Sequence, residues 1–242
     1  MLKILAIAAH PDDVELSASG TILKHTQMGH AVAILDLTEG ELGTRGSVEL
    51  RYEEAANAAK VLGVPVRMNA RMADGFFKND EENQRTLIAY IRHFRPEIVI
   101  ANALSDRHPD HGKGGKLIAD ACFLSGLRKI ETEWEGKPQD AWRPKRVFHM
   151  IQDRVLEPSF IVDISSVYEK KMESILCYKS QFASNDSTEP ETYISSDQFL
   201  NTIRGRDTLM GKRIGVAYGE GFVCENTPGI KDLDQLILPI FP

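Results

Sequence analysis

The chain opens with Met1-Leu-Lys-Ile-Leu-Ala-Ile-Ala-Ala-His10-Pro-Asp-Asp13, a short apolar run that ends abruptly in polar residues. Residues Ile4–Ala8 are continuously apolar, which is typical of a strand buried on both faces of a parallel sheet. The run is too short for the apolar region and separate cleavage site of a signal peptide. We therefore predict an internal strand whose carboxyl end carries polar side chains.

Apolar runs alternate with helical patterns through the first half of the chain. Three further runs predict strands, at residues 31–37, 64–68 and 97–101. Two segments between them have helical spacing: 48–62, with Ser47 as N-cap and Gly63 as stop, and 87–94, after Asp80. Alternation of this kind gives right-handed crossovers between parallel strands. We expect a single domain over residues 1–242, with a doubly wound α/β fold, a mostly parallel sheet and helices on both faces.

The second half of the chain is less regular. Strands are expected at 148–151 and 160–164, a helix at 167–178, and a polar excursion at 131–145. Residues 183–197 are rich in Ser, Thr, Asn and Glu, and they are a candidate for a mobile loop over a site. Residues 203–222 are basic and rich in glycine, so they indicate either an anion-binding segment or a solvated helix end.

Composition excludes several classes of protein. The 242 residues include 29 Lys and Arg against 35 Asp and Glu, a net charge of −6, and 42% are hydrophobic, which indicates a soluble globular protein. An acidic chain without an apolar run of ~18 residues is not expected to bind nucleic acid or to span or coat a membrane. The three cysteines form no CxxC pair, so we expect free thiols in a cytoplasmic protein rather than disulfides or a thiolate zinc site.

Two polar motifs mark a candidate site. Ligands of open α/β sheets bind beyond the carboxyl ends of the strands. His10-Pro-Asp-Asp13 follows the first predicted strand, and Asp106-Arg-His-Pro-Asp-His111 follows the fourth. Either motif alone is consistent with an ordinary capped helix start, because acids suit the positive end of the helix dipole. The presence of both at one sheet edge favours a functional site.

The two motifs contain the ligands for one metal ion. A hydrolytic zinc site uses three protein ligands and keeps a fourth position for water. His10 and Asp13 can converge across a strand-to-helix turn. We choose His111 as the third ligand, because Pro109 suits the first position of the next helix and places His111 in its first turn.

The remaining acids and histidine of the motifs are candidates for proton transfer. Asp12 is adjacent to a ligand but is expected to point elsewhere, where it can take the proton from water. His108 can donate a hydrogen bond to a developing oxyanion or protonate a leaving nitrogen. Asp110 is expected behind the site, where it would fix the tautomer of a histidine.

Substrate contacts are expected from two other segments. Residues 38–47, Thr-Glu-Gly-Glu-Leu-Gly-Thr-Arg-Gly-Ser, follow the second strand at the same edge, and Arg45 or the nearby Arg51 can grip a carboxylate. The alternative is a glycine-rich loop with solvated arginines. The segment is not a dinucleotide fingerprint, since no G-x-G-x-x-G follows the first strand. Tyr193 can close over a substrate or be a surface aromatic.

The paired motifs closely resemble the LmbE-like (PIG-L) family of zinc-dependent N-acetylglucosamine deacetylases, which implies a Rossmann-like fold. Residues 38–47, Arg51 and residues 218–222 are similar to the branch that removes acetyl from N-acetylglucosaminyl malate in bacillithiol biosynthesis. By this resemblance the zinc ligands are His10, Asp13 and His111, the general base is Asp12 and the electrostatic stabiliser is His108.

The resemblance also implies the wider setting of the reaction. Arg51 would read the malate carboxylates, and Tyr193 would contact the transition state. The partner would be a small amino-sugar substrate, and the protein would form homo-oligomers, as trimers or hexamers. A site of two histidines and one aspartate can hold Zn²⁺ or Fe²⁺.

Three other functions stay open from the sequence. Relatives in such a family act on other N-acetylglucosamine conjugates and on chitin fragments. A non-catalytic Rossmann-like module that binds a sugar or a nucleotide would use both motifs only as helix caps. A phosphoesterase would keep the metal, although the motifs offer one carboxylate ligand and no second-metal cluster.

Overall fold

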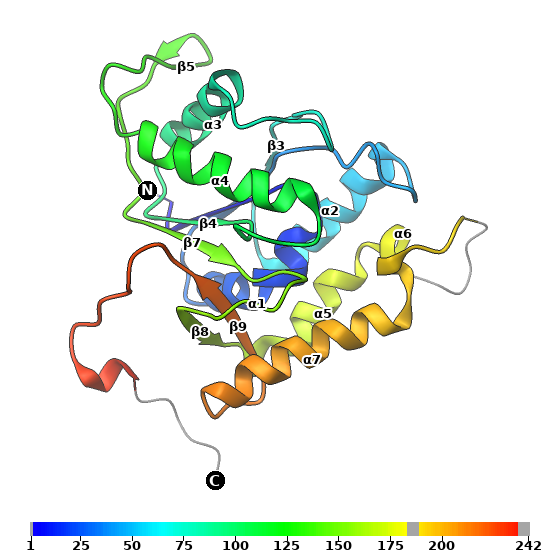
Figure 1. Cartoon of the computed structure of the whole chain (residues 1–242). Helices are drawn as coiled ribbons and strands as arrows, with labels where there is room; N and C mark the ends of the chain where they lie inside the picture. The colour runs from blue at the N-terminus through cyan, green and yellow to red at the C-terminus, as the bar shows by residue number, and fades with distance from the viewer. Residues whose placement is uncertain (1, 183–188, 237–242) are drawn as a thin grey trace.

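Strand β1 (Ile4–Ala8) lies near the middle of a seven-stranded sheet (Figure 1). The computed structural model describes residues 2–182 and 189–236. The strand order is β3-β2-β1-β4-β7-β9-β8. The other strands are β2 (Val32–Asp36), β3 (Val66–Asn69), β4 (Ile98–Ala101), β7 (Arg146–Met150), β8 (Phe160–Asp163) and β9 (Gly219–Val223). Every residue of β1 and β2 is buried, as the continuous apolar runs predict.

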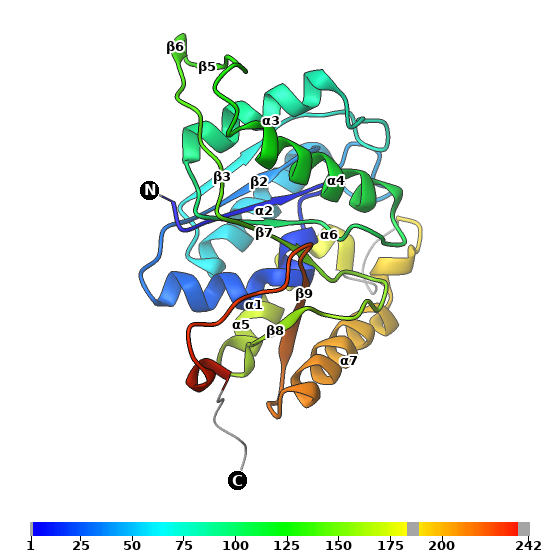
Figure 2. The ribbon, with the colours of Figure 1, turned by 60° about the vertical axis from the view of Figure 1, so that its left-hand side comes forward.

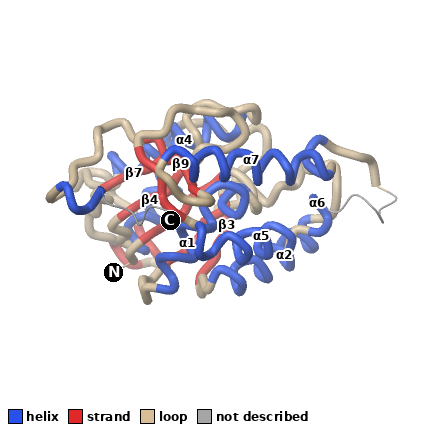
Figure 3. Tube along the Cα trace, turned by 90° about the horizontal axis from the view of Figure 1, so that it is seen from below, coloured by secondary structure: helices blue, strands red, loops and turns tan. Residues whose placement is uncertain are grey.

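Helices cover both faces of the sheet (Figure 2). On one face lie α3 (Glu81–Phe94) and α4 (Pro109–Leu124), and on the other lie α1 (Asp13–Gln27), α2 (Val48–Leu62) and α5 (Tyr168–Leu176). The long helix α7 (Asp197–Arg213) packs on β9. Figure 3 shows from below that α5 and α7 both extend toward the short helix α6 (Lys179–Phe182). None of the helices in the described ranges combines the length and apolarity that a bilayer crossing requires.

The expected single-domain, doubly wound α/β fold is confirmed, and the local signals act as predicted. The hydroxyl of Ser47 accepts a hydrogen bond from the backbone N–H of Leu50, and Gly63 ends α2 with φ +67°. The carboxylate of Asp80 caps α3 by accepting from the N–H of Asn83. Pro109 occupies the first turn of α4. Cap and stop residues therefore set the ends of these helices.

Strand β9 differs from the sequence-based expectation. Residues 203–222, interpreted as an anion-binding segment or a helix end, form the second half of α7 and then β9, which runs antiparallel between β7 and β8. Glycines hide this strand in the sequence, because Gly219 and Gly221 bring no apolar side chains. Their small size is required: a Cβ on Gly219 would lie 2.6 Å from the Ile161 side chain.

Two segments of the second half, residues 131–145 and the described part of 183–197, contain only short elements of secondary structure. The polar excursion at 131–145 contains a short hairpin of β5 (Glu133–Trp134) and β6 (Lys137–Pro138). Of the candidate loop at 183–197, residues 183–188 lie outside the described part of the chain. The described remainder contains a 3-10 turn, η2 (Tyr193–Ser195), and the first residue of α7.

A buried ionic cluster joins the C-terminal third of the chain to α1. The ammonium of Lys171 on α5 lies 2.7 Å from Asp207 on α7 and 2.9 Å from Glu220 on β9, and all three side chains are at most 1% exposed. The Glu220 carboxylate also accepts hydrogen bonds from the backbone N–H groups of Gly20 and Thr21, at 2.8 and 2.7 Å. Four elements therefore share one set of charges.

Replacing Lys171 by methionine tests how strongly this cluster holds the fold. Lys171→Met leaves two buried carboxylates without their shared cation, so we expect the free energy of unfolding to fall by about 3–5 kcal/mol. Urea denaturation measures the change. The control is Lys170→Met, an exposed neighbour on the same helix, which should stay within about 0.5 kcal/mol of wild type. Equal stability of the two variants would contradict the prediction.

Candidate active site

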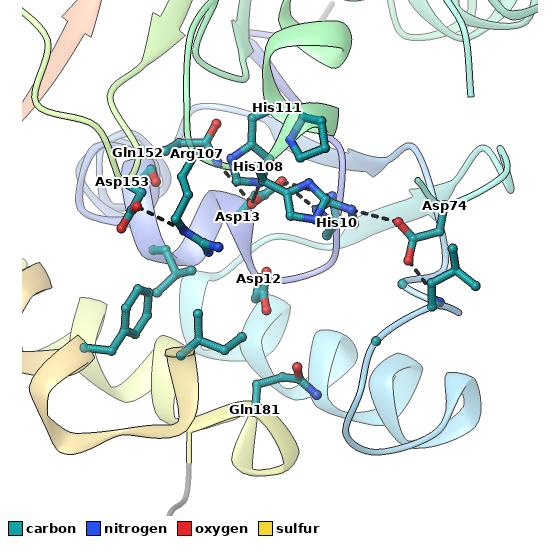
Figure 4. Close-up of a pocket in the computed structure, with 18 of the residues that line it drawn as sticks. His10, Asp12, Asp13, Asp74, Arg107, His108, His111, Gln152, Asp153 and Gln181 are labelled. Carbon is teal, nitrogen blue, oxygen red and sulfur yellow. Dashed lines mark hydrogen bonds and ion pairs between the residues drawn. The ribbon is translucent and has the colours of Figure 1, made fainter. Parts of the chain in front are cut away.

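The two polar motifs meet where the sheet order changes direction. Strands β1 and β4 are parallel neighbours, with Ile7 paired to Ala101, so their carboxyl ends lie together. Strands β2 and β3 lie on one side of β1, whereas β4 and β7 lie on its other side. Doubly wound folds form a crevice at the point where the strand order reverses in this way. A cavity of about 340 Å³ opens there (Figure 4), and both motifs line it with His10, Asp12, Asp13, His108 and His111.

The carboxylate of Asp13 accepts several hydrogen bonds within the site. The donors are the backbone N–H of His10, the Asn102 amide and the Gln152 amide, each at 3.0 Å. Burial alone would raise its pKa, but the facing His111 and His10 hold the pKa of Asp13 well below its usual range. Asp13 is therefore an ionised carboxylate with its oxygens fixed in direction.

His111 is oriented by a second carboxylate. Its Nδ1 lies 2.6 Å from Asp106 Oδ2, and its Nε2 lies 3.0 Å from Asp13 Oδ1. Burial lowers the pKa of His111, yet Asp13 and Asp106 outweigh burial and raise it to about 9. A histidine whose Nδ1–H is held by a carboxylate presents Nε2 as the atom that can bind a metal.

His10 is also held between two carboxylates, but here Nε2 contacts the orienting acid and Nδ1 faces Asp13. Its Nε2 lies 2.9 Å from Asp74 Oδ1 and 3.5 Å from Asp110 Oδ2, whereas Nδ1 faces Asp13 Oδ2 at 3.6 Å. The other oxygen of Asp74 accepts the backbone N–H of Leu42 at 3.0 Å. Asp74 therefore joins the glycine-rich loop after β2 to His10, and it leaves Nδ1 of that ring facing Asp13.

His108 lies beside both other histidines but has different bonding. The rings of His108 and His10 are 4.7 Å apart, and ligand-capable atoms of His10, His108 and His111 lie within 4.8 Å of one another. His108 caps α4, because its Nδ1 accepts the backbone N–H of Asp110 at 3.3 Å. A neutral ring with that bond carries its proton on Nε2 and has no free lone pair for a metal.

The charge state of His108 follows from its neighbours. Burial, and then the nearby His10 and His111, lower the pKa of His108. The ring is therefore a neutral donor through Nε2–H, which suits a hydrogen bond to an oxyanion better than delivery of a proton.

Asp12 is held in a strained conformation at the start of α1. Its φ of 121° lies in a region that residues other than glycine rarely adopt. Such backbone strain is often found at functional sites. Burial raises the pKa of Asp12 to about 7, although the guanidinium of Arg51, 3.4 Å away, opposes the change. A carboxylate of that pKa in the cavity is suited to accept a proton near neutral pH.

Of the three residues expected to contact the substrate, only Arg51 lines the cavity. Its guanidinium donates a hydrogen bond to the carbonyl oxygen of Pro11 at 3.0 Å. Arg45 is 3% exposed and its Nε lies 3.6 Å from Glu189, outside the lining of the cavity. Tyr193 is half-exposed beside the cavity mouth, where its hydroxyl donates to Asp153 at 3.0 Å.

Sequence reasoning missed the residues that orient the site. Asp74, Asn102 and Gln152 were not singled out, and Asp106 had no role of its own. Each lies within about six residues after a strand, at the carboxyl edge where ligands bind, so the edge rule applied to β3 and β7 would have drawn attention to Asp74 and Gln152. Asp110, expected behind a histidine, also accepts the backbone N–H of Gly75 at 2.7 Å and pairs with Lys113.

Known proteins share this sequence and fold. Residues 5–122 match the PIG-L family, described as GlcNAc-PI de-N-acetylase. Diacetylchitobiose deacetylase of Thermococcus kodakarensis is 31% identical over 94% of this chain and 84% of its own. 4-Oxalmesaconate hydratase of Pseudomonas putida is 27% identical over 73% of each chain. The probable N-acetyl-alpha-D-glucosaminyl L-malate deacetylase 2 of Bacillus anthracis is 26% identical over 74% of this chain and 81% of its own.

A solved structure extends the similarity to the whole fold. The conserved protein TT1542 from Thermus thermophilus superposes with a TM-score of 0.85 and 33% identity, over 95% of this chain and 97% of that chain. Because the PIG-L match spans both polar motifs and a deacetylase 31% identical to the chain covers nearly all of it, the chain belongs to the PIG-L family of deacetylases and is an enzyme.

Proposed function

We propose that the chain is a metal-dependent N-deacetylase that hydrolyses the acetamido group of an N-acetylglucosamine conjugate. The convergence of His10, Asp13 and His111 beside Asp12 is the observation that carries the proposal. Two of the relatives are named as deacetylases of acetylated glucosamine compounds, which supports the same reaction.

The donor set fits a divalent cation. His10 Nδ1 and His111 Nε2 each face an oxygen of the Asp13 carboxylate, at 3.6 and 3.0 Å, and Asp74 and Asp106 hold the opposite nitrogens of the two rings. Two imidazoles and one carboxylate suit Zn²⁺, and Fe²⁺ accepts the same ligands. A cation bound there would acidify water and polarise a carbonyl oxygen.

The other side chains divide the proton transfers. Asp12 takes a proton from water as the water oxygen adds to the amide carbonyl carbon. The Nε2–H of His108 donates to the oxygen that becomes negatively charged. The C–N bond then breaks and the nitrogen takes up the proton from Asp12. The products are a free amine and a carboxylic acid, which loses its remaining proton to solvent and becomes a carboxylate.

We propose N-acetylglucosaminyl malate as the substrate. The supporting observations are the relative that is named for this compound and two of the three arginines in the cavity lining, Arg51 and Arg107. Guanidinium groups match the planar carboxylates of malate. Diacetylchitobiose is the competing substrate, because the deacetylase named for it is 31% identical to this chain.

The function is tested by measuring amine release from N-acetylglucosaminyl malate, diacetylchitobiose and N-acetylglucosamine, with and without a chelator. We expect the malate conjugate to have the highest kcat/KM and the chelator to abolish activity with every substrate. A higher kcat/KM with diacetylchitobiose would reassign the substrate. Absence of amine release from all three substrates would reject the proposed function. If a separate assay then showed hydration of 4-oxalmesaconate, a hydratase function would replace it.

Substitution of Asp12 separates its chemical role from its backbone strain. Asp12→Ala and Asp12→Gly should both retain metal and lose about two or more orders of magnitude in kcat, because both lack the base. Glycine tolerates a φ of 121° and alanine does not, so Asp12→Gly should be more stable than Asp12→Ala by about 1 kcal/mol. Metal analysis, kinetics and urea denaturation check the three parts. Normal turnover in either variant would refute the role of Asp12.

Asp74→Asn tests the orientation of His10. The asparagine side chain is uncharged and has only one oxygen, so it cannot accept hydrogen bonds from His10 Nε2–H and the Leu42 N–H as the two carboxylate oxygens do. The metal dissociation constant should therefore rise by about 10–100-fold. Competition with a chromogenic chelator measures the constant without a turnover assay. Asp120→Asn, at the far side of α4, provides the control and should bind metal normally. Unchanged affinity in Asp74→Asn would show that Asp74 does not position His10.

A further inference from the structure

We propose that four apolar side chains on one wall of the cavity form an acyl subsite that restricts the enzyme to short acyl groups. This inference rests on the proposed function as an N-deacetylase. The four residues are Leu16, Ile194, Phe199 and Ile203, and all of them line the cavity that contains the metal-binding motifs.

The wall is built beside the proposed base. Leu16 lies four residues after Asp12 at the start of α1, and residues at that spacing share one face of a helix. Phe199 and Ile203 have the same spacing on α7. The two helices therefore present apolar side chains to the cavity from two directions, with Asp12 at the edge of the apolar surface.

The wall is backed by packed residues. Phe199 stacks on Phe182, with ring centroids 5.9 Å apart, and Tyr193 meets Phe199 edge-on at 5.5 Å. Phe182, Phe199 and Ile203 are at most 5% exposed and belong to one core cluster. A side chain packed in this way does not move aside for a longer ligand without a cost in packing energy.

An arginine fixes the spacing between the two helices. Arg206, three residues after Ile203, donates to the backbone carbonyl oxygens of Leu16 and Gln152, the latter at 2.8 Å. The same side chain pairs with the buried Asp207 at 3.1 Å. The gap between α7 and the first turn of α1 is therefore set by hydrogen bonds to backbone atoms.

The polarity of the cavity decides which part of the substrate meets this wall. The rest of the lining is mainly polar: it contains the histidines and acids of the metal centre, three arginines, Ser17 and two glutamines, with Leu42, Pro109 and three glycines beside them. Sugar hydroxyls find hydrogen-bond partners on that part of the lining, whereas the wall offers none. The carbonyl carbon must lie near Asp12 for water to add to it, and of the groups bonded to that carbon only the alkyl group lacks polar atoms, so we place the alkyl group against the wall.

The subsite predicts a preference by acyl length. Acetyl fits against the wall, and each added methylene must displace packed side chains. One methylene in an apolar pocket changes specificity by about 10–200-fold. We therefore expect the wild-type kcat/KM to be at least tenfold higher for the N-acetyl than for the N-butyryl form of the same amino sugar. Ile203→Ala should raise the butyryl-to-acetyl ratio by about tenfold or more.

The experiment compares N-acetyl, N-propionyl and N-butyryl substrates in four proteins: wild type, Ile203→Ala, Ile194→Ala and Leu209→Ala. Leu209 is on α7 but is 48% exposed and outside the cavity lining, so its variant should keep the wild-type ratio. Ile194 is half-buried in the η2 turn, so its variant provides the test if Ile203→Ala does not fold.

The outcomes distinguish the two proposals. Amine release with a butyryl-to-acetyl ratio that is raised in the wall variants and unchanged in Leu209→Ala would support the subsite. Amine release with the same ratio in all four proteins, or a wild type that cleaves butyryl as fast as acetyl, would overturn the subsite alone. Absence of amine release from every substrate would reject the deacetylase function on which the subsite rests.

Discussion

The carboxylate of Asp13 ties together the ends of three strands, and the geometry of the site depends on it. Its donors are the backbone N–H of His10 after β1, the Asn102 amide after β4 and the Gln152 amide after β7. The same Asn102 side chain also binds the end of β1, because its amide oxygen Oδ1 accepts a hydrogen bond from the backbone N–H of Ala9 at 2.7 Å. A buried charge must be satisfied by hydrogen bonds, and here three neighbouring strands provide them. The strand ends cannot shift without leaving that charge unpaired.

The C-terminal part of the chain completes a site that the first motifs only begin. Helix α1 carries Asp12 and Asp13 at its start, and Glu220 from β9 binds the backbone of its middle. Arg206 from α7 binds the carbonyl oxygen of Leu16 in the same helix. The match to the PIG-L family covers residues 5–122, which include both polar motifs and Leu16, whereas Gln152 and the other three residues of the apolar wall come from beyond that range. The surface proposed to select the acyl group therefore combines one residue next to the first motif with three from the C-terminal part of the chain.

The sequence predicts the elements whose signals are local. Continuous apolar runs identify β1 and β2, and cap residues such as Ser47 and Asp80 identify helix starts, because neighbours along the chain cause these structures. The place of β9 between β7 and β8 is a long-range pairing of a glycine-rich strand, which no periodicity reveals. Asp74 illustrates the same limit at the site. A single aspartate in a loop has no motif, and its role depends on a contact with a histidine 64 residues earlier.

Two adjacent aspartates in the first motif acquire opposite properties from the backbone between them. Asp13 faces two imidazoles, which hold its pKa well below the usual range despite burial, and it accepts three further hydrogen bonds. Asp12 is equally enclosed, but burial raises its pKa to about 7, because the guanidinium of Arg51 at 3.4 Å only partly offsets the effect of burial. A relaxed φ at Asp12 would change the direction of its side chain relative to that of Asp13. The strain at φ 121° therefore keeps the two carboxylates apart, so that Asp13 faces the histidines and Asp12 lies in the environment that suits its proposed role as the base.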